Sequence, residues 1–298
     1  MTGQRALVVE GGAMRGIFAA GVLDSFMDND FRPFDFALGV SAGSTNLAGY
    51  LCGQRGRSYK LITDYSCRHN FFNIGKFLRG GHYIDLDWLW NIAYREYRLD
   101  AFAYANQSIP LWVVSTNVET GKAEYHCADA ENLEHLLLAS CAVPLAYRSF
   151  PLVNGMGQTD GGVADSIPVK EAYLRGARHI TVILSQPRGY RKKPPRLPAF
   201  THYALREYPN LAAAMINRHQ TYNESMEFID NPPADCRVDV IVPGEDFAVG
   251  RTTTDPKKLA FGYELGILQG QAYFSDQNRV SSAELKIRKT GQEHCAVK

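Results

Sequence analysis

The sequence predicts an α/β fold with a mainly parallel central sheet. Two consecutive strand–turn–helix units open the chain, and short apolar runs typical of buried parallel strands recur at residues 111–116 and 180–184. A hydrophobic fraction of 45% over 298 residues is enough to form a sizeable core. This size fits one large domain, or one domain with an appendage.

The first unit begins with residues 5–10 (RALVVE), a short apolar run that ends at glycines. Residues 14–27 follow with apolar side chains at helical spacing. In the second unit, residues 34–40 (FDFALGV) form a predicted buried strand. Ser41 comes next, and residues 42–51 are a predicted helix of small side chains. Such paired units predict parallel strands covered by helices.

The middle of the chain has a different character. Residues 54–110 are rich in aromatic and basic side chains, and we interpret them as an insertion over the sheet, with a helix-like segment at 85–97. After this insertion the pattern predicts helices at 131–139 and 168–175, and a turn-rich stretch at 155–162.

Residues 188–198 (RGYRKKPPRLP) combine charge with proline, which disfavours both helix and strand and indicates a linker or exposed loop. A mostly helical part follows. It contains a predicted strand at 237–242 and a helix that begins at Asp255-Pro256, because an N-cap followed by proline starts helices. We therefore divide the chain into a core, residues 1–185, and a mostly helical C-terminal extension packed on it, residues 186–298.

Charge and composition exclude several functions. The formal net charge is +1, so no nucleic-acid partner is expected. No apolar stretch approaches the roughly 20 residues of a membrane span, and the N-terminal residues do not resemble a signal peptide. The six cysteines contain no CxxC pair and the eight histidines no metal spacing. We expect a cytoplasmic protein without cofactor or metal.

Residues 39–43 read Gly-Val-Ser-Ala-Gly, a GxSxG motif between a predicted strand and a predicted helix. A sharp strand-to-helix turn, the nucleophile elbow, holds its serine in a strained, exposed position. Gly39 and Gly43 remove the Cβ atoms that would clash there. This context indicates that Ser41 is an activated nucleophile, although the motif also arises by chance.

A glycine-rich run, here called the glycine loop, joins the first strand to the first helix. Its residues are Gly11, Gly12, Ala13, Met14, Arg15 and Gly16. Unpaired N–H groups at a helix start favour an anion. The anion is either a ligand phosphate or the oxyanion of an attacked ester, unless the loop is only a tight turn. The dinucleotide fingerprint fails, because Ala13 replaces its second glycine.

A third motif, Asp160-Gly161-Gly162, completes an ordered set with the glycine loop and GxSxG. This set resembles the patatin-like phospholipase family. The segment 139–144 (ASCAVP) is similar to the A-S-x-A-x-P of that family, as are Pro168, Ala172 and Gly176-Ala177 to its next helix. The resemblance covers about residues 5–185.

The resemblance implies a three-layer α/β/α fold and a serine lipid acyl hydrolase, of phospholipase or esterase type, that acts in lipid degradation. Ser41 would be the nucleophile and Asp160 its general base, in a Ser–Asp dyad that needs no cofactor. The backbone of the glycine loop would form the oxyanion hole, and Arg15 would hold it in shape. Ala13 and Ser166 depart from the family, which has glycine and asparagine in many members.

Two weaker features each allow two interpretations. The aromatic side chains of the insertion either line an acyl pocket or pack as core: Phe71, Phe72, Phe77, Trp88, Trp90, Tyr94 and Tyr97. The basic loop at 188–198 either contacts anionic headgroups of a membrane transiently or is simply solvated.

Two other functions compete with the patatin-like one. A conventional α/β-hydrolase would pair Ser41 with a downstream histidine, for which the candidates are His179, His202, His219 and His294. Its nucleophile follows several strands, whereas Ser41 follows only two. A non-catalytic module would bind a phosphorylated or acyl ligand at the glycine loop, and Ser41 and Asp160 would be dispensable.

Overall fold

A computed structural model describes the backbone of residues 3–295 and the side chains of residues 3–276. It contains an eight-stranded sheet with the order β5-β6-β3-β2-β1-β7-β8, in which β4 also pairs with β3. The strands are β1 (Gln4–Val9), β2 (Phe36–Val40), β3 (Leu111–Asn117), β4 (Ala123–Cys127), β5 (Leu152–Val153), β6 (Met156–Asp160), β7 (Ala177–Ile183) and β8 (Arg237–Ile241).

The two opening units form as predicted. β1 pairs in parallel with β2 on one side and β7 on the other, and β2 pairs in parallel with β3. The short helix η1 (Ala13–Arg15) leads into α1 (Gly16–Asp28), and α2 (Ala42–Leu51) follows β2. The carboxyl ends of β1 and β2 therefore lie side by side, at the edge where α/β folds bind ligands.

The turn-rich stretch predicted at 155–162 was wrong in most of its length. Asn154 and Gly155 make a tight turn with positive φ values of 51° and 77°. The residues after them extend as β6, which pairs antiparallel with β5 and β3. Gly157 pairs with Leu152 of β5 and Thr159 with Thr116 of β3. The pairing with β3 is a long-range contact that local turn propensity does not reveal.

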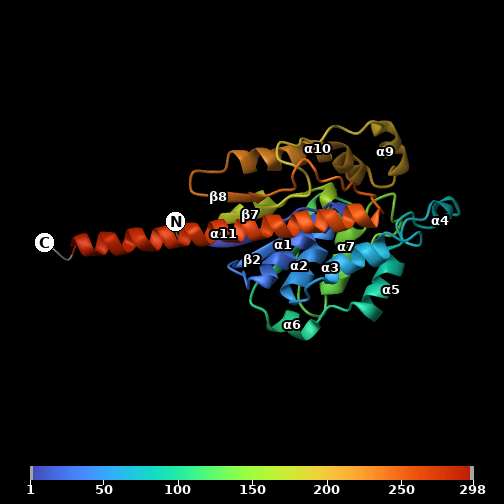
Figure 1. Cartoon of the computed structure of the whole chain (residues 1–298). Helices are drawn as coiled ribbons and strands as arrows, with labels where there is room; N and C mark the ends of the chain where they lie inside the picture. Colours follow the sequence, from blue (N-terminus) through green and yellow to red (C-terminus); the bar gives the residue numbers. More distant parts are fainter. Residues whose placement is uncertain (1–2, 296–298) are drawn as a thin grey trace.

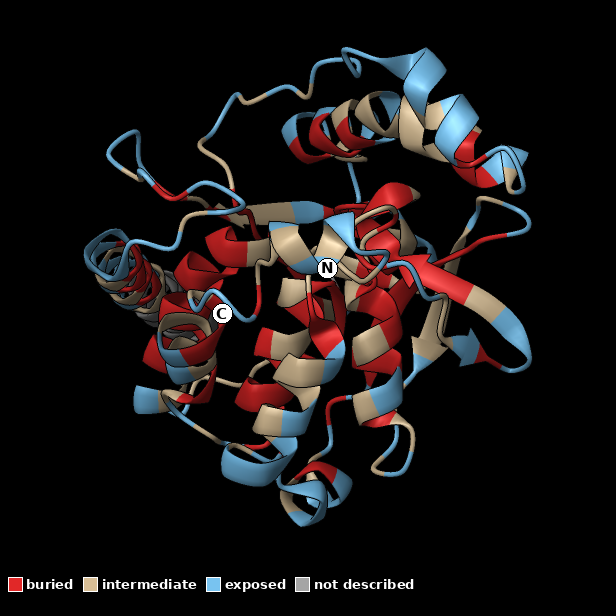
Figure 2. Ribbon diagram, turned by 90° about the vertical axis from the view of Figure 1, so that its right-hand side faces the viewer, coloured by how far each residue is buried: buried red, intermediate tan, exposed pale blue. Residues whose placement is uncertain are grey.

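Helices cover both faces of the sheet, which gives three layers (Figures 1 and 2). Leu7 and Val9 of β1 point to one face and pack with α1, α2 and α7 (Leu133–Cys141). Ala6 and Val8 alternate to the other face, where they pack with α8 (Val169–Leu174) and α10 (Pro209–Asp230). This alternation is what a buried strand between two helical layers requires.

The insertion is mainly helical and forms a cover at one end of the sheet. Its helices are α3 (Arg57–Lys60), η2 (Leu61–Ser66), α4 (Ile74–Leu78), α5 (Leu86–Glu96) and α6 (Ala101–Asn106). Tyr83 N–H donates to Ala146 O at 2.8 Å, and Trp90 Nε1–H to Glu134 O at 3.1 Å. These bonds tie the insertion to α7 and the segment after it.

The C-terminal part contains α9 (Pro198–Ala204), α10, β8 and α11 (Pro256–Cys295). The stretch at 188–197 lacks regular structure, as predicted. Asp255 caps α11 and accepts the N–H of Lys257 at 2.9 Å. β8 lies in parallel beside β7, and α11 packs along α1 (Figure 1). The division at residue 185 stays a prediction. Within the described part, no helix is both long and apolar enough to cross a bilayer.

Candidate active site

Ser41 occupies the turn between β2 and α2 in a strained conformation, with φ 52° and ψ −126°. A non-glycine residue held in such a region costs about 1–3 kcal/mol. The turn depends on its glycines, since a Cβ on Gly43 would lie 2.4 Å from Val9 O and one on Gly39 2.6 Å from Ser44 Cα. Ser41 is only 6% exposed, so the expectation of an exposed serine was wrong. Its surroundings shield it from bulk solvent, and it lines a pocket.

A hydrogen-bond chain fixes the backbone of this turn. Ser41 N–H donates to Ser140 Oγ at 2.8 Å, and Ser140 Oγ–H donates to Val114 O at 2.6 Å. Ser140 is fully buried. Its positioning role was not foreseen, although the A-S-x-A-x-P segment was the signal for it.

Asp160 ends β6 and is 7% exposed. Its Oδ1 accepts the N–H of Gly162 at 2.7 Å, and its own N–H donates to Ala142 O at 2.9 Å. Gly161 packs so tightly on β3 that a Cβ there would lie 2.2 Å from Val114 O. The Gly162 N–H therefore holds the carboxylate, and the 139–144 segment holds the backbone of Asp160.

Ser41 and Asp160 lie at the same edge of the sheet, on either side of β3. Val40 pairs with Val114, and Asp160 with Ser115, the next residue of β3. Two interstrand spacings separate them, or about 10 Å between backbones. Cys141 lies near both: burial, and then the Asp160 carboxylate, raise the pKa of its thiol, while a hydrogen bond with the Ser41 side chain opposes the shift.

The glycine loop packs directly against this turn. A Cβ on Gly11 would lie 2.8 Å from Val40 O and 3.1 Å from Ser41 Cβ. Ala13 has a positive φ of 50°. Across the described residues, the N–H groups of Gly11, Gly12 and Ala13 have no hydrogen-bond acceptor. Donors left free beside a serine are what an oxyanion site requires.

Arg15 is buried below the loop, where burial lowers the pKa of its guanidinium. Its Nη2 lies 3.8 Å from Oε1 of Glu10, whose other oxygen accepts Ser185 N–H at 2.6 Å. Gly16 begins α1 against Ala42, and a Cβ there would lie 2.9 Å from the Ala42 Cβ. These contacts hold the loop between β1 and α2.

An apolar pocket of about 130 Å³ opens at Ser41. Ala13 and Met14 of the glycine loop line one part of it, and Cys141 and Val143 another. The insertion supplies most of the rest: Leu61, Ile62, Phe71, Phe72, Ile84, Leu86, Leu89, Trp90, Ala93 and Tyr94. Four of the seven aromatic residues considered from the sequence thus line it, whereas Phe77, Trp88 and Tyr97 do not.

Of the histidines with described side chains, none lines this pocket. His179 contacts Asp239 at 2.7 Å on the side of the sheet toward β8. His202 lies in α9 and His219 in α10. The side chain of His294 lies outside the described residues.

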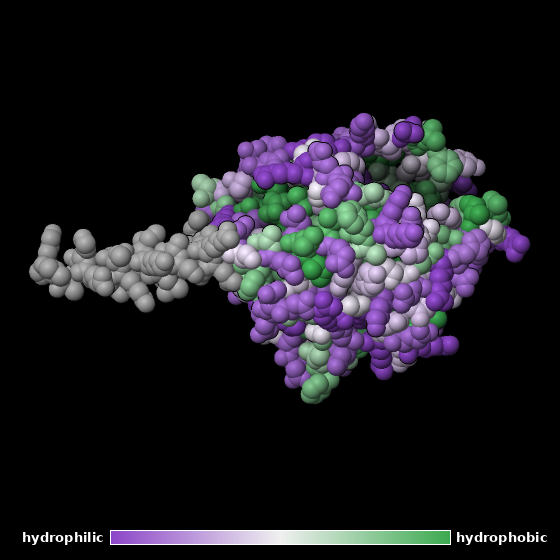
Figure 3. Space-filling model, viewed as in Figure 1, coloured by the Kyte–Doolittle hydropathy of each residue, from purple (hydrophilic) through white to green (hydrophobic). Residues whose placement is uncertain are grey.

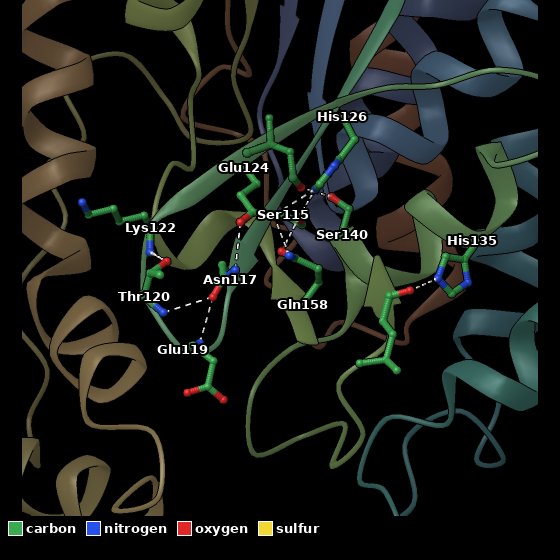
Figure 4. Close-up of polar contacts among 12 residues, drawn as sticks. Ser115, Asn117, Glu119, Thr120, Lys122, Glu124, His126, His135, Ser140 and Gln158 are labelled. Atoms are coloured by element: carbon green, nitrogen blue, oxygen red, sulfur yellow. Dashed lines mark hydrogen bonds and ion pairs between the residues drawn. The ribbon is translucent and has the colours of Figure 1, made fainter. Parts of the chain in front are cut away.

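A second serine, Ser115, lies in a polar cluster with His126 and Glu124 (Figure 4). His126 Nε2 lies 2.8 Å from Ser115 Oγ and 3.7 Å from Oε2 of Glu124. In a catalytic triad the serine and the acid contact different ring nitrogens. Here both contact the same one, Ser115 is fully buried, and its hydroxyl donates to Gln158 Oε1 at 2.7 Å. This cluster is therefore a structural network between β3, β4 and β6.

Together the fold and site define an α/β protein with a strained serine in a strand-to-helix turn, a glycine loop and an apolar pocket. The patatin-like phospholipase family matches residues 7–173, more than half of the chain. The chain belongs to this family of lipid acyl hydrolases. A domain of unknown function (DUF6363) matches residues 208–281.

Two individual proteins are similar over nearly the whole chain. The uncharacterized protein YjjU of Escherichia coli (strain K12) is 33% identical over 287 residues, which span 92% of this chain and 78% of YjjU. The crystal structure of VipD from Legionella pneumophila matches with a TM-score of 0.52 at 15% identity, and covers 92% of this chain and 67% of VipD. The predicted patatin-like α/β fold is confirmed.

Proposed function

We propose that this chain hydrolyses carboxylic ester bonds of lipids, with Ser41 as nucleophile and Asp160 as general base. The observation that carries this proposal is the strained Ser41 turn, which opens on an apolar pocket and packs against unpaired N–H groups of the glycine loop. Strain at a buried polar residue is costly, so it is kept where it serves a function.

The chemistry follows from the residues. Asp160 accepts the proton of Ser41 while Oγ attacks the ester carbonyl, and the N–H groups of Gly11, Gly12 or Ala13 stabilise the developing oxyanion. When the tetrahedral intermediate collapses, Asp160 returns the proton to the leaving alcohol. Water, deprotonated by the same carboxylate, then releases the acyl group and restores the serine.

The pocket supports an acyl chain as the group transferred to Ser41. Its walls are aliphatic and aromatic, and a chain bound there would bury apolar surface at roughly 25 cal/mol per Å². Phe71 and Trp90 of the insertion lie on this wall, so the insertion would set the acyl length accepted.

The test is labelling with a fluorophosphonate probe, followed by peptide mapping. We expect the label on Ser41, and Ser41→Ala should lose both labelling and hydrolysis of p-nitrophenyl butyrate while it keeps its circular dichroism spectrum. A variant that retains more than a few per cent of wild-type kcat would contradict the nucleophile assignment, because loss of a nucleophile that acts within a catalytic unit costs orders of magnitude.

We also propose transient contact with a membrane surface through α9. Phe200 and Tyr203 of α9 are exposed, as is Leu197 just before the helix, and exposed basic residues precede them, including Lys193 and Arg196. Figure 3 shows hydrophobic side chains gathered at the end of the molecule where α9 lies. Exposed aromatic side chains beside cations are typical of interfacial binding.

Sedimentation with phosphatidylglycerol vesicles tests this contact. Phe200→Ser should reduce the bound fraction, whereas Leu174→Ser, which removes an even more exposed apolar side chain on α8, should not. Equal sedimentation of both variants and the wild type would contradict the proposal.

A further inference from the structure

A second hollow, of about 400 Å³, borders the glycine loop. Ala13 and Met14 line the apolar pocket, whereas the next residue, Arg15, lines this hollow. We call it the basic pocket, because its polar lining consists mainly of cations: Arg15, Lys192, Lys193, Arg218 and Arg251, together with His219.

These cations come from four separate segments of the chain. Arg15 belongs to the glycine loop, Lys192 to the loop before α9, Arg218 to α10 and Arg251 to the loop after β8. The fold therefore brings them together, unlike a solvated run of charge on one helix. No acidic residue lines the pocket. Within the described part of the chain, Arg15 is the only one of these cations that forms a salt bridge, and its partner is Glu10. The other four cations form no salt bridge within the described residues, so their mutual repulsion favours binding of an anion.

Two buried polar atoms beside the loop lack a partner in the described residues. They are Nε of Arg15, a side chain that is 6% exposed, and Oγ of Ser185, which is 3% exposed. A Cβ on Gly12 would lie 2.9 Å from that Oγ. Buried polar atoms are nearly always hydrogen-bonded, so these two groups are available to bind a ligand beside the loop. An arginine fork matches phosphate oxygens in geometry and charge.

Burial lowers the pKa of Lys192, and the positive charges of this cluster lower it further. Burial lowers the pKa of its ammonium to about 6; Arg218, Arg251 and Arg15 add to this shift, and Glu10 opposes it. The ammonium lies 4.2 Å from the ring centroid of Tyr222, and Tyr190 also lines the pocket. An anion bound among these cations would favour the charged lysine, so binding near pH 7 would take up a proton.

The basic pocket adjoins the candidate catalytic residues. An ideal Cβ on Gly162 would lie 2.8 Å from Nη2 of Arg218 and 2.9 Å from Oδ1 of Asp160. On the other side, Arg251 O accepts the N–H of Met14 at 3.4 Å. A group bound in the basic pocket would therefore lie next to both Asp160, the proposed base, and the glycine loop.

We propose that the basic pocket binds a phosphate group, held by Arg15, Lys192, Arg218 and Arg251 beside the site of ester cleavage. The phosphate belongs either to the headgroup of the lipid whose acyl chain enters the apolar pocket or to a free phosphate ligand. The lipid source rests on the proposed hydrolase function, whereas phosphate binding does not.

Binding is measured by titration calorimetry on the full chain, with inorganic phosphate and glycerol 3-phosphate as probes. Arg251→Gln should weaken both at least tenfold, since it removes one charge-assisted contact. Arg251 is exposed, so its loss should leave the fold intact. The charge-matched control is Lys122→Gln, an exposed lysine that lines neither pocket. Titration in two buffers of different ionisation enthalpy should show proton uptake at pH 7, which Lys192→Gln abolishes.

Kinetics separate the two sources of phosphate. For a headgroup, Arg251→Gln lowers kcat/KM at least tenfold on 1-acylglycerol 3-phosphate and leaves the matched 1-acylglycerol within about twofold. If inorganic phosphate binds but Arg251→Gln changes kcat/KM equally on both esters, the pocket binds a free phosphate ligand and not a lipid headgroup. If neither probe binds the wild type, the proposal is overturned. If the wild type cleaves neither ester, the hydrolase function fails, and calorimetry still decides phosphate binding.

Discussion

Replacing Asp160 with asparagine should abolish catalysis almost as completely as loss of Ser41. Oδ1 of Asp160 accepts the N–H of Gly162, and an asparagine carbonyl can accept the same bond. The amide then places NH₂ where the second carboxylate oxygen was. The shape is preserved while the basicity is lost, so the effect isolates proton transfer from packing.

The magnitude follows from the lack of a second base near Ser41 among the described residues. The apolar pocket is lined by no histidine with a described side chain and by one carboxylate, Glu134. Glu134 lies seven residues before Cys141 on α7, about 10 Å along the helix from the residue that contacts Ser41. General-base catalysis contributes about 10²–10⁴-fold, and residues that act as a unit lose more together than singly. We therefore expect kcat to fall by about 10³-fold or more, equivalent to about 4 kcal/mol of transition-state stabilisation.

The assay is kcat on p-nitrophenyl butyrate, a soluble ester that avoids lipid interfaces. Circular dichroism and thermal unfolding confirm that Asp160→Asn folds. His126→Ala and His179→Ala serve as controls, since both side chains lie outside the pocket, and neither should act as a catalytic knockout.

Two results would refute the dyad. One is an Asp160→Asn variant that retains a tenth or more of wild-type kcat. The other is a histidine variant that folds normally but loses about 10³-fold, which would favour the conventional triad hydrolase.

Three further predictions concern the loop, metals and pH. Gly12→Val should lower kcat by roughly 10²-fold, because its Cβ would lie 2.9 Å from the Ser185 side chain and displace the loop; normal turnover would make the loop a mere turn. EDTA should not change hydrolysis of a soluble ester, since the described residues contain no cluster of three metal-ligating side chains, and loss of activity that Ca²⁺ restores would contradict this. Burial raises the pKa of Asp165 to about 6, above the roughly 4 of an unfolded aspartate, so the folded state binds more protons between these values. The free energy of unfolding should therefore gain a contribution as pH falls from 7 to 4, and urea titrations of Asp165→Asn should lack it; an unchanged slope would refute the assignment.

The sequence predicted the parts of the site that local chemistry determines. The Ser41 turn needs glycine at positions 39 and 43, so the motif alone located it. The apolar strands β1, β2, β3 and β7 were equally visible, because each is buried on both faces. β6 was not, since Gly157 and the glycines that flank the strand suggest turns, and pairing with β5 and β3 extends this segment.

The basic pocket could not be predicted for a related reason. Arg218 and Arg251 lie in unremarkable helix and loop sequence, far along the chain from Arg15. Only the packing of α10 and the loop after β8 against the glycine loop brings them together. The charged run at 188–198, which contains Lys192, is visible in the sequence, but periodicity and motifs do not show which residues a loop packs against.

The parallel pairing of β8 with β7 has a consequence for how this chain can be divided. The family match ends at residue 173, yet the sheet is completed only at Ile241. A chain cut after residue 185 would leave the apolar strand β7 with a free edge, and exposed edges of this kind recruit other chains. Exchange of C-terminal parts between relatives would therefore transfer β8 together with any ligand preference. Chimaeras should fold only if the transferred strand keeps the register of β8 against β7.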